Sequence, residues 1–368
     1  MDAALPTSLL IGSCEAFGGK SAVVLGLLRQ LINAGAQVHY GKPLATSFEA
    51  QQSGAVLLDD DVQFVGQILQ LPQPQLLPSL QRLSAASARE QLLQGGLQAT
   101  AQTALSALRQ QLQAVDASAL VLLEAAGTLH EGVLHGLSLL QIAHGLDLPA
   151  LLVHAWSDER SAEPLLEAKA QLGDRLAGVV LNAVPPDRVE LLRSETVPAL
   201  ERVGIPVLGV LPRSPLLRSV TVEELVARLE AQVLCCQDRL DLLVETLSIG
   251  AMNVNAAMEF FRRRRNMAVV TGADRTDIQL AALEASTQCL ILTGVGEPLP
   301  QLINRAEELE VPLLKVDHDT LTTVEVIEQA FGHVRLHEGV KATYAMRLVQ
   351  DHCDFASLFE RLRLPQLS

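Results

Sequence analysis

The chain is poor in aromatic residues and in positive charge. Of its 368 residues only 3% are aromatic, and 28 Lys and Arg stand against 42 Asp and Glu, which gives a net charge of −14. A surface of that sign repels nucleic-acid backbones and anionic lipid, and few rings are present to stack on bases. Nucleic acids and membranes are therefore not expected as partners.

Cysteine pairs and uninterrupted apolar runs are also scarce. The five cysteines are scattered and include no CxxC pair, so neither a disulfide framework nor a zinc site is indicated. The most apolar long region, 133–156, is interrupted by His135, Gln141, His144, Asp147 and Pro149, which a bilayer-spanning helix would not carry. Residues 1–10 lack the basic start of a signal peptide. A cytoplasmic location is expected.

Aliphatic residues are abundant, and they are arranged in short runs that alternate with helical stretches. With 49% hydrophobic residues the chain can bury packed cores, and its length suggests two domains. Continuous runs of four to six aliphatic residues are typical of strands buried on both faces. Such runs lie at 119–123, 150–155, 177–181 and 207–211, a shorter apolar run lies at 8–11, and 37–40 is a further strand candidate. This pattern predicts an α/β fold with a doubly wound, mainly parallel, Rossmann-like sheet.

The pattern restarts after Pro212-Arg213-Ser214-Pro215, which reads as a linker. A smaller α/β domain is expected there, followed by a tail that contains one helix at 341–362. The strands of this smaller domain are predicted at 267–271, 289–293 and 312–316, and its helices near 253–263, 276–285, 300–309 and 320–331. The predicted boundaries are 1–213, 214–332 and 333–368.

The strongest chemical signal is Gly12-Ser13-Cys14-Glu15-Ala16-Phe17-Gly18-Gly19-Lys20-Ser21, between the first strand and the first helix. Inward-facing backbone N–H groups, a helix N-terminus and a lysine together bind phosphate. Gly18 and Gly19 permit the tight loop, Lys20 supplies charge, and the Ser21 hydroxyl is a candidate Mg²⁺ ligand. Cys14 stands where the full motif has glycine, and the nearest glycine is Gly12. The alternative is an ordinary strand-to-helix turn with a surface lysine.

Polar residues follow three other predicted strands. The carboxyl ends of parallel strands meet at one edge of the sheet, where ligands bind. Lys42 is therefore expected to face the same crevice as Lys20, Glu124 to hold Mg²⁺ or its water, and the Asn182 amide to read an adenine edge. The alternatives are a solvated lysine, an acid exposed at the sheet edge and a turn asparagine.

In this order, these elements resemble the dethiobiotin synthetase-like P-loop family over residues 1 to about 213. The resemblance implies ATP and Mg²⁺ as cofactors and a metal-binding part for Glu15, whose alternative is an exposed loop acid. Dimeric switch ATPases carry a second lysine at the position of Glu15, which argues against that subclass.

The second domain contains a similar strand-to-turn signal, Val270-Thr271-Gly272-Ala273-Asp274-Arg275-Thr276-Asp277. With Leu290-Ile291-Leu292-Thr293-Gly294 and Gly250-Ala251-Met252, it resembles the DRTGG domain, although Asp277 and Ile278 replace the two glycines. Asp274, Arg275 and Thr276 are expected to supply a helix cap and an anion-facing N-terminus. With Thr293 and Gly294 they form a candidate ligand or subunit-contact site. A structural ion pair of Asp274, with Arg275 or another partner, is the alternative.

A dethiobiotin synthetase-like domain followed by a DRTGG domain resembles the front half of long-form bacterial phosphate acetyltransferases. That resemblance implies regulation and assembly, and acetyl transfer is not expected because it belongs to a third domain. The favoured function is a nucleotide-binding regulatory or scaffold protein, expected to form homo-oligomers and to contact protein partners. An ATP-dependent ligase that activates a carboxylate or carbamate, and a degenerate interaction module without nucleotide, are the alternatives.

Overall fold

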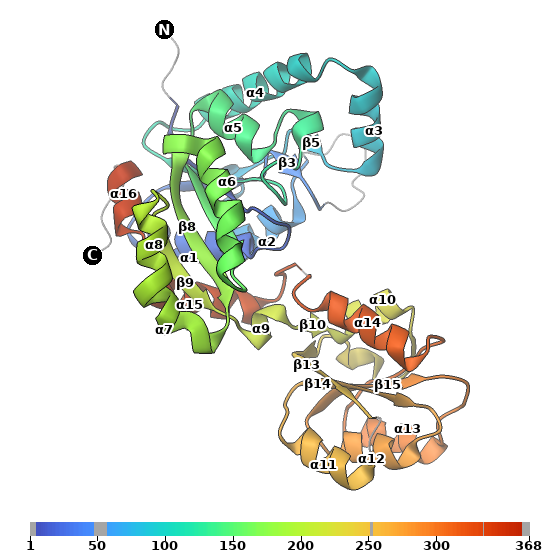
Figure 1. The fold of residues 1–368 in the computed structure, drawn as a ribbon. Coiled ribbons are helices and arrows are strands. Elements are labelled where there is room, and N and C mark those ends of the chain that lie inside the picture. Colours follow the sequence, from blue (N-terminus) through green and yellow to red (C-terminus); the bar gives the residue numbers. More distant parts are fainter. Residues whose placement is uncertain (1–4, 48–56, 251–252, 334, 363–368) are drawn as a thin grey trace. The chain divides into compact units, whose positions relative to one another are not determined.

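The computed structural model describes residues 5–47, 57–250, 253–333 and 335–362. The chain divides into two compact units (Figure 1). The first comprises Met1–Arg213 together with Arg335–Ser368, and the second comprises Ser214–Val334. The second unit is thus inserted into the chain of the first. Of the residues that resemble the DRTGG domain, Ala251 and Met252 lie outside the described part.

The first unit is built on a seven-stranded parallel sheet in the order β4-β2-β6-β1-β7-β8-β9. Its strands are β1 (Thr7–Gly12), β2 (Val38–Gly41), β4 (Leu76–Leu77), β6 (Leu120–Glu124), β7 (Ala150–Ala155), β8 (Leu176–Val184) and β9 (Val207–Pro212). Most of their residues are buried on both faces, as the aliphatic runs predicted. In the β1–β6 register Ile11 lies opposite Glu124, so the carboxyl ends of these strands are neighbours. The predicted doubly wound α/β fold is confirmed.

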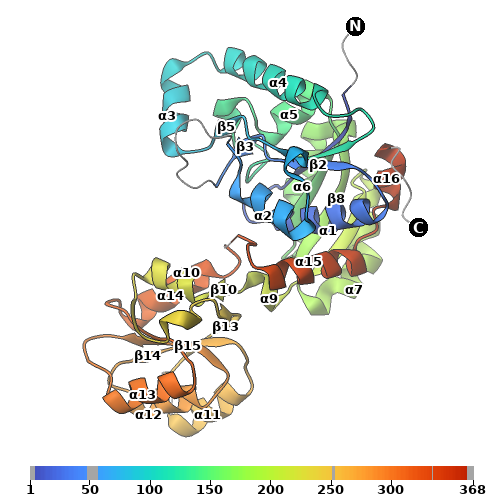
Figure 2. The ribbon, with the colours of Figure 1, turned by 180° about the vertical axis from the view of Figure 1, so that it is seen from behind.

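Helices cover both faces of this sheet. Figures 1 and 2 show α6 on one face, with α1 and α15 on the other. The main helices are α1 (Lys20–Asn33), α2 (Asp60–Leu69), α3 (Ala85–Gln94), α4 (Leu97–Gln113), α5 (Leu139–Leu146), α6 (Ala162–Leu172), α8 (Val197–Arg202), α15 (Gly339–His352) and α16 (Ala356–Leu362). Gly26 of α1 lets α15 approach closely, because a Cβ there would collide with Val349.

The prediction of one helix over 341–362 is wrong. The chain forms α15 and α16, and between them Cys353 makes a β-bridge with Gly209 of β9. The Asp354 amide also donates to Leu208 O at 2.8 Å. These backbone bonds require extended geometry, so pairing with the sheet edge interrupts a segment whose own pattern is helical. The tail is part of the first unit.

The second unit contains a five-stranded sheet in the order β11-β16-β15-β14-β13, in which only β11 is antiparallel to its neighbour. The strands are β11 (Gln232–Cys235), β13 (Thr246–Ile249), β14 (Met267–Gly272), β15 (Thr287–Thr293) and β16 (Leu313–Lys315). One core packs under α10 (Val222–Leu229) and α14 (Thr320–Ala330). The other packs under α11 (Val254–Arg262), α12 (Thr276–Leu283) and α13 (Pro300–Glu308). The second, smaller α/β domain is confirmed, and β11 and β13 were not predicted.

Among the helices of the described residues, none combines the length and the apolar character that crossing a bilayer requires.

Candidate functional site

The loop of residues 12–21 winds closely around the N-terminus of α1. Gly19 precedes the helix with φ 92°, a left-handed conformation that favours glycine. A Cβ at Gly19 would collide with the Asn182 amide, and one at Gly18 with the Ser13 hydroxyl. Gly12 ends β1 against the Leu139 side chain. The two glycines before the lysine are therefore required by backbone conformation and close packing.

Two predicted site residues brace this loop. Asn182 Nδ2 donates to Gly18 O at 3.0 Å, so this amide holds the loop from β8, two strands away from β1 in the sheet. Glu15 Oε1 accepts from the Ala155 amide at 3.0 Å and lies 3.5 Å from His154 Nδ1, at the end of β7. Contact with adenine for Asn182 and with metal for Glu15 stay predictions.

Lys20 is the first residue of α1 and points toward the loop that follows β6. Its Nζ donates to Gly127 O at 3.1 Å. Burial lowers the pKa of Lys20; the Glu124 carboxylate opposes that shift, and the positive charge of Lys42 adds to it. A half-buried cation whose described hydrogen-bond acceptor is a neutral carbonyl is well placed to receive an anion.

Glu124 ends β6 and is 2% exposed. Its Oε2 accepts from the Tyr40 hydroxyl at 2.7 Å. Burial raises the pKa of Glu124, although the charges of Lys42 and Lys20 pull it down. The predicted acid at the strand end is thus buried, and it interacts electrostatically with both predicted lysines.

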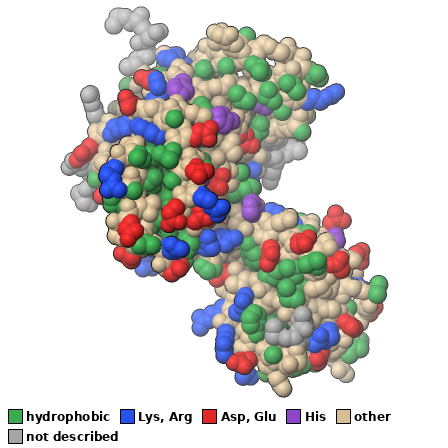
Figure 3. Space-filling model, in the orientation of Figure 1, with side chains coloured by type: hydrophobic (Ala, Val, Ile, Leu, Met, Phe, Trp, Pro, Cys, Tyr) green, Lys and Arg blue, Asp and Glu red, His purple; other side chains and the backbone are tan. Residues whose placement is uncertain are grey.

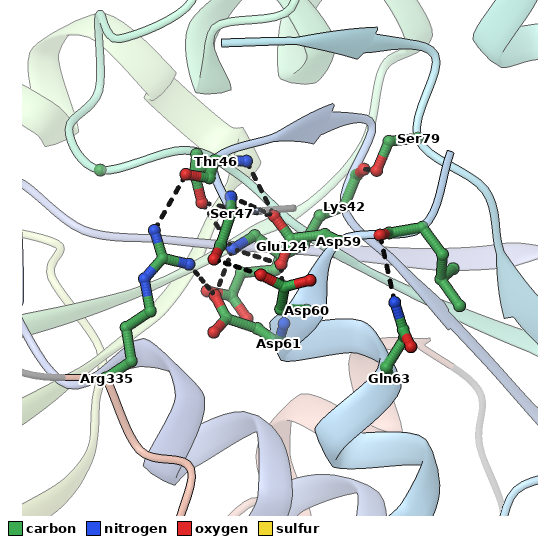
Figure 4. Close-up of polar contacts among 12 residues, drawn as sticks. Lys42, Thr46, Ser47, Asp59, Asp60, Asp61, Gln63, Ser79, Glu124 and Arg335 are labelled. Atoms are coloured by element: carbon green, nitrogen blue, oxygen red, sulfur yellow. Dashed lines mark hydrogen bonds and ion pairs between the residues drawn. The ribbon is translucent and has the colours of Figure 1, made fainter. Parts of the chain in front are cut away.

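Lys42 lies in an ion cluster rather than in solvent, and only 3% of it is exposed (Figure 4). Its Nζ lies 2.6 Å from Asp61 Oδ2 and 3.2 Å from Asp59 Oδ1, and it donates to Thr46 Oγ1 at 2.9 Å. Burial alone would lower the pKa of Lys42, but the carboxylates of Glu124, Asp61 and Asp59 together raise it. Lys42 is therefore firmly charged, and its charge is compensated inside the protein.

The two acids beside Lys42 are held differently. Asp59 precedes α2 as its cap: one oxygen accepts from the Asp61 amide at 2.9 Å, and the other from the amides of Thr46 and Ser47 at 2.8 and 3.1 Å. Asp61 accepts instead from side chains: Arg335 Nη1 at 3.2 Å and His337 Nε2 at 2.9 Å. Burial would raise the pKa of Asp61, but the His337 hydrogen bond, Lys42 and Arg335 lower it.

Sequence reasoning missed most of this cluster. The sequence does contain a signal for Asp59-Asp60-Asp61, because an aspartate followed by further acids is typical of the start of a helix. Arg335 and His337 carry none, because they stand 274 and 276 residues from Asp61 in the chain. The structure brings them together with Lys42 at this edge of the sheet.

The local geometry suits a phosphate group better than it defines a metal site. Glycines that permit close approach, a helix N-terminus and a lysine beside it are what a phosphate needs. Ser21, the second residue of α1, is partly exposed. Within the described ranges, no three or more His, Cys, Asp or Glu side chains are grouped so as to hold a metal ion. Magnesium ligation by Ser21, Glu15 and Glu124 therefore stays a prediction.

The second unit arranges its corresponding turn without a side-chain cap. Arg275 occupies the position before α12 and makes no capping hydrogen bond, so the predicted cap is wrong. A guanidinium only donates and cannot accept from the free N–H groups of a helix start. Arg275 Nε instead contacts Asp277 Oδ1 at 3.3 Å. Gln279 Nε2 closes the turn by donating to Gly272 O at 2.8 Å.

The other predicted residues of the second unit lie along the same sheet edge. Thr276 is the first residue of α12. Thr293 Oγ1 lies 2.8 Å from Thr320 Oγ1 and donates to Thr271 O at 3.4 Å, which joins the ends of β14 and β15 to the start of α14. Gly294 follows with φ 81° and open space around the position of a Cβ. A ligand or subunit contact here stays a prediction.

Comparison with known families accounts for both units. The AAA domain family matches residues 7–221, more than half of the chain. The chain belongs to the AAA domain family. Its AAA domain is the dethiobiotin synthetase-like P-loop domain that the 12–21 loop predicted. The DRTGG domain matches residues 224–330 and follows the AAA domain in the predicted order.

Curated relatives match nearly the whole chain with about half of their own length. The chain is 27% identical to the phosphate acetyltransferase of Nitratidesulfovibrio vulgaris over 381 residues, covering 97% of this chain and 52% of that protein. It is also 27% identical to the phosphate acetyltransferase of Synechocystis sp. over 385 residues, covering 98% and 52%. The chain therefore spans about half the length of these relatives.

Solved structures are more distant. The CBS and DRTGG region of Clostridium perfringens pyrophosphatase, solved with the activator diadenosine tetraphosphate, matches with a TM-score of 0.28 and 20% identity, over 38% of this chain and 57% of that one. The MinC:MinD cell division complex of Aquifex aeolicus matches with a TM-score of 0.33 and 14% identity, over 57% of this chain and 83% of that one. TM-scores this low indicate only a limited structural similarity.

Proposed function

We propose that the AAA domain binds a nucleotide, ATP with Mg²⁺, at the 12–21 loop, and that the chain is a nucleotide-binding regulatory or scaffold module. The observation that carries the proposal is Lys20, a half-buried lysine that begins α1 directly after the left-handed Gly19. The phosphates would lie at this helix start, beside Lys20 and within reach of the charge of Lys42. Bound Mg²⁺ would neutralise part of the phosphate charge, with Ser21, Glu15 and Glu124 as its candidate ligands.

The electrostatics support an anion at this position. Burial lowers the pKa of Lys20, which means that its ammonium group lacks full compensation in the folded protein. A phosphate would give it a charge-assisted hydrogen bond, stronger than the bond to the carbonyl of Gly127. The left-handed Gly19 and the tightly packed Gly18 allow backbone N–H groups to approach the same oxygens.

The regulatory part of the proposal follows from the pairing of the two domains. Both occur in about half the length of the phosphate acetyltransferases that the chain matches. Acetyl transfer is not assigned to this chain, because a match to 52% of a relative does not carry that relative's activity. Ligand-controlled assembly, through homo-oligomers or a protein partner, is the role that we propose instead.

A thermal-shift panel tests nucleotide binding directly. ATP, ADP and GTP are each added with and without Mg²⁺ to the wild type, to Lys20→Ala and to Lys315→Ala, a control in the second unit. A ligand at a hundred times its Kd adds about 2.7 kcal/mol of stability, so a Mg²⁺-dependent shift is expected in the wild type and in Lys315→Ala. Lys20→Ala should show none, while keeping its unfolding transition without ligand. If no nucleotide shifts the melting temperature of the wild type, the proposal is overturned, and the alternative of an interaction module without nucleotide is left.

An ATP-dependent ligase is the second candidate, favoured by one observation. Lys20, Lys42 and Glu124 interact at one sheet edge, where a ligase would hold ATP and a carboxylate or carbamate. Release of ADP that requires bicarbonate and a diamine together would support the ligase. Tight binding with no turnover under those conditions would leave the regulatory function.

A further inference from the structure

The Asp61 carboxylate in the ion cluster is held by three basic side chains, among them Lys42 and Arg335 (Figure 4). One of its oxygens lies 2.6 Å from Lys42 Nζ and 3.2 Å from Arg335 Nη1, and the other accepts from His337 Nε2 at 2.9 Å. Arg335 and His337 come from the segment that follows the second unit in the chain. A site assembled mainly from residues before 213 is therefore completed by residues after 334.

Lys42 cannot bind a phosphate while its ammonium group is paired with the carboxylates of both Asp59 and Asp61. Asp59 is bound to three backbone amides, so its position is fixed by the start of α2. Among the hydrogen bonds described for the Asp61 carboxylate, none comes from a backbone amide. If Lys42 turned from Asp61 toward an anion, Asp61 would lose its closest cation in a buried setting, which is costly unless other donors remain.

Arg335 and His337 are those remaining donors, and both are anchored independently of Lys42. Arg335 Nη2 donates to Thr46 O at 2.9 Å, and the His337 ring packs against Phe64 with centroids 5.3 Å apart. A few residues on, Glu338 pairs with the buried Lys341 at 3.1 Å, at the start of the helix that packs on α1. The segment is thus held in place with the Arg335 and His337 side chains directed at Asp61.

We propose that Arg335 and His337 are positioning residues for the nucleotide site: they keep Asp61 compensated so that Lys42 is able to turn to a nucleotide phosphate. This inference rests on the proposed function and deepens it, because it makes nucleotide binding in the AAA domain depend on the segment that leaves the DRTGG domain. Without Arg335, the full charge of Asp61 retains Lys42, and phosphate binding weakens.

A double-mutant cycle tests this dependence with ATP and Mg²⁺ as the probe. The Kd is measured by calorimetry on the full chain for the wild type, Arg335→Gln, Asp61→Asn and the double variant. Arg335→Gln is expected to weaken binding about tenfold. Asp61→Asn is expected to bind at least as tightly as the wild type, because the neutral amide no longer retains Lys42. The double variant should match Asp61→Asn, since Arg335 has no charge left to compensate.

Two further variants separate charge from folding. Arg335→Lys keeps the charge and should recover most of the affinity lost in Arg335→Gln. Arg347→Gln, which removes an exposed arginine of α15 paired with Asp351, should leave the Kd unchanged. The fluorescence of Trp156, the single tryptophan, which is buried in the first unit, reports whether each variant is folded.

The possible results point to different failures. A wild type that binds no nucleotide overturns the proposed function, and this inference with it. A wild type that binds, with Arg335→Gln equal to it or tighter, overturns only the inference. So does a double variant as weak as Arg335→Gln, because a purely structural defect would not be relieved by neutralising Asp61.

Discussion

The two units build similar sheet edges and treat charge in opposite ways. Each has a parallel strand, a short turn and a helix start, at β1–α1 in the first and β14–α12 in the second. Figure 3 shows acidic and basic side chains of both signs on the surface of each unit. Within the described ranges, the buried Asp, Glu and Lys residues all lie in the first unit: Lys42, Asp59, Asp61, Glu124 and Lys341. The buried polar residues of the second unit are uncharged.

This difference separates a candidate binding site from a structural interior. Burying a charge opposes folding unless it is paired, and well-packed apolar residues are often more stable than a buried ion pair. The second unit follows that rule, and its turn cation Arg275 is paired with Asp277 in solvent. The first unit buries Lys42, Asp59, Asp61 and Glu124 at the edge of its sheet where we propose that phosphate binds. The contrast predicts unequal responses to matched substitutions.

The largest difference is expected between two lysines. Lys42→Met leaves Asp59 and Asp61 buried without their shared cation, and should lower the free energy of unfolding of the first unit by about 3 kcal/mol. Lys315→Met removes a pair with Glu297 whose acid is 81% exposed, and should change stability by less than about 1 kcal/mol. Scanning calorimetry, with Trp156 fluorescence to mark the first unit, measures both. Equal losses would contradict the contrast.

Two left-handed glycines should differ by less. Gly19→Ala combines a strained φ of 92° with a collision against Asn182, whereas Gly294→Ala at φ 81° meets open space. The first is expected to cost about 2 kcal/mol and the second about 1 kcal/mol. Urea denaturation checks these values. Gly19→Ala should also weaken nucleotide binding and Gly294→Ala should not; loss of binding in both would place part of the nucleotide site in the second unit.

The smallest expected effect concerns Glu124 and pH. Burial raises the pKa of this carboxyl above its ordinary value. Ionisation of Glu124 therefore opposes folding at any pH above the pKa that a glutamate has in the unfolded chain. At low pH both states are protonated and the penalty vanishes. Glu124→Gln should therefore raise the melting temperature by about 2 °C at pH 8 and by less at pH 5. A gain that is larger at pH 5 would contradict the direction of the pKa shift.

Much of the fold was predictable because it depends on local patterns. Aliphatic runs of strand length marked β6, β7 and β9, and Gly18-Gly19-Lys20 marked the start of α1. The break between α15 and α16 was not predictable, because Cys353 pairs with Gly209 of β9 far earlier in the chain. The failure of Arg275 as a cap was predictable in principle, since its guanidinium has no acceptor.

The candidate site divides along the same line. The sequence by itself determined that a glycine-rich loop, two lysines and an acid follow strands of one parallel sheet, and the carboxyl ends of such strands lie at the same edge whatever their distance in the chain. Only the tertiary structure decided which charges are buried together. Lys42 lies between Asp59 and Asp61, and Arg335 reaches Asp61 across 274 residues. Burial makes each of these charges depend on its neighbours in space, and no local pattern in the chain records those neighbours.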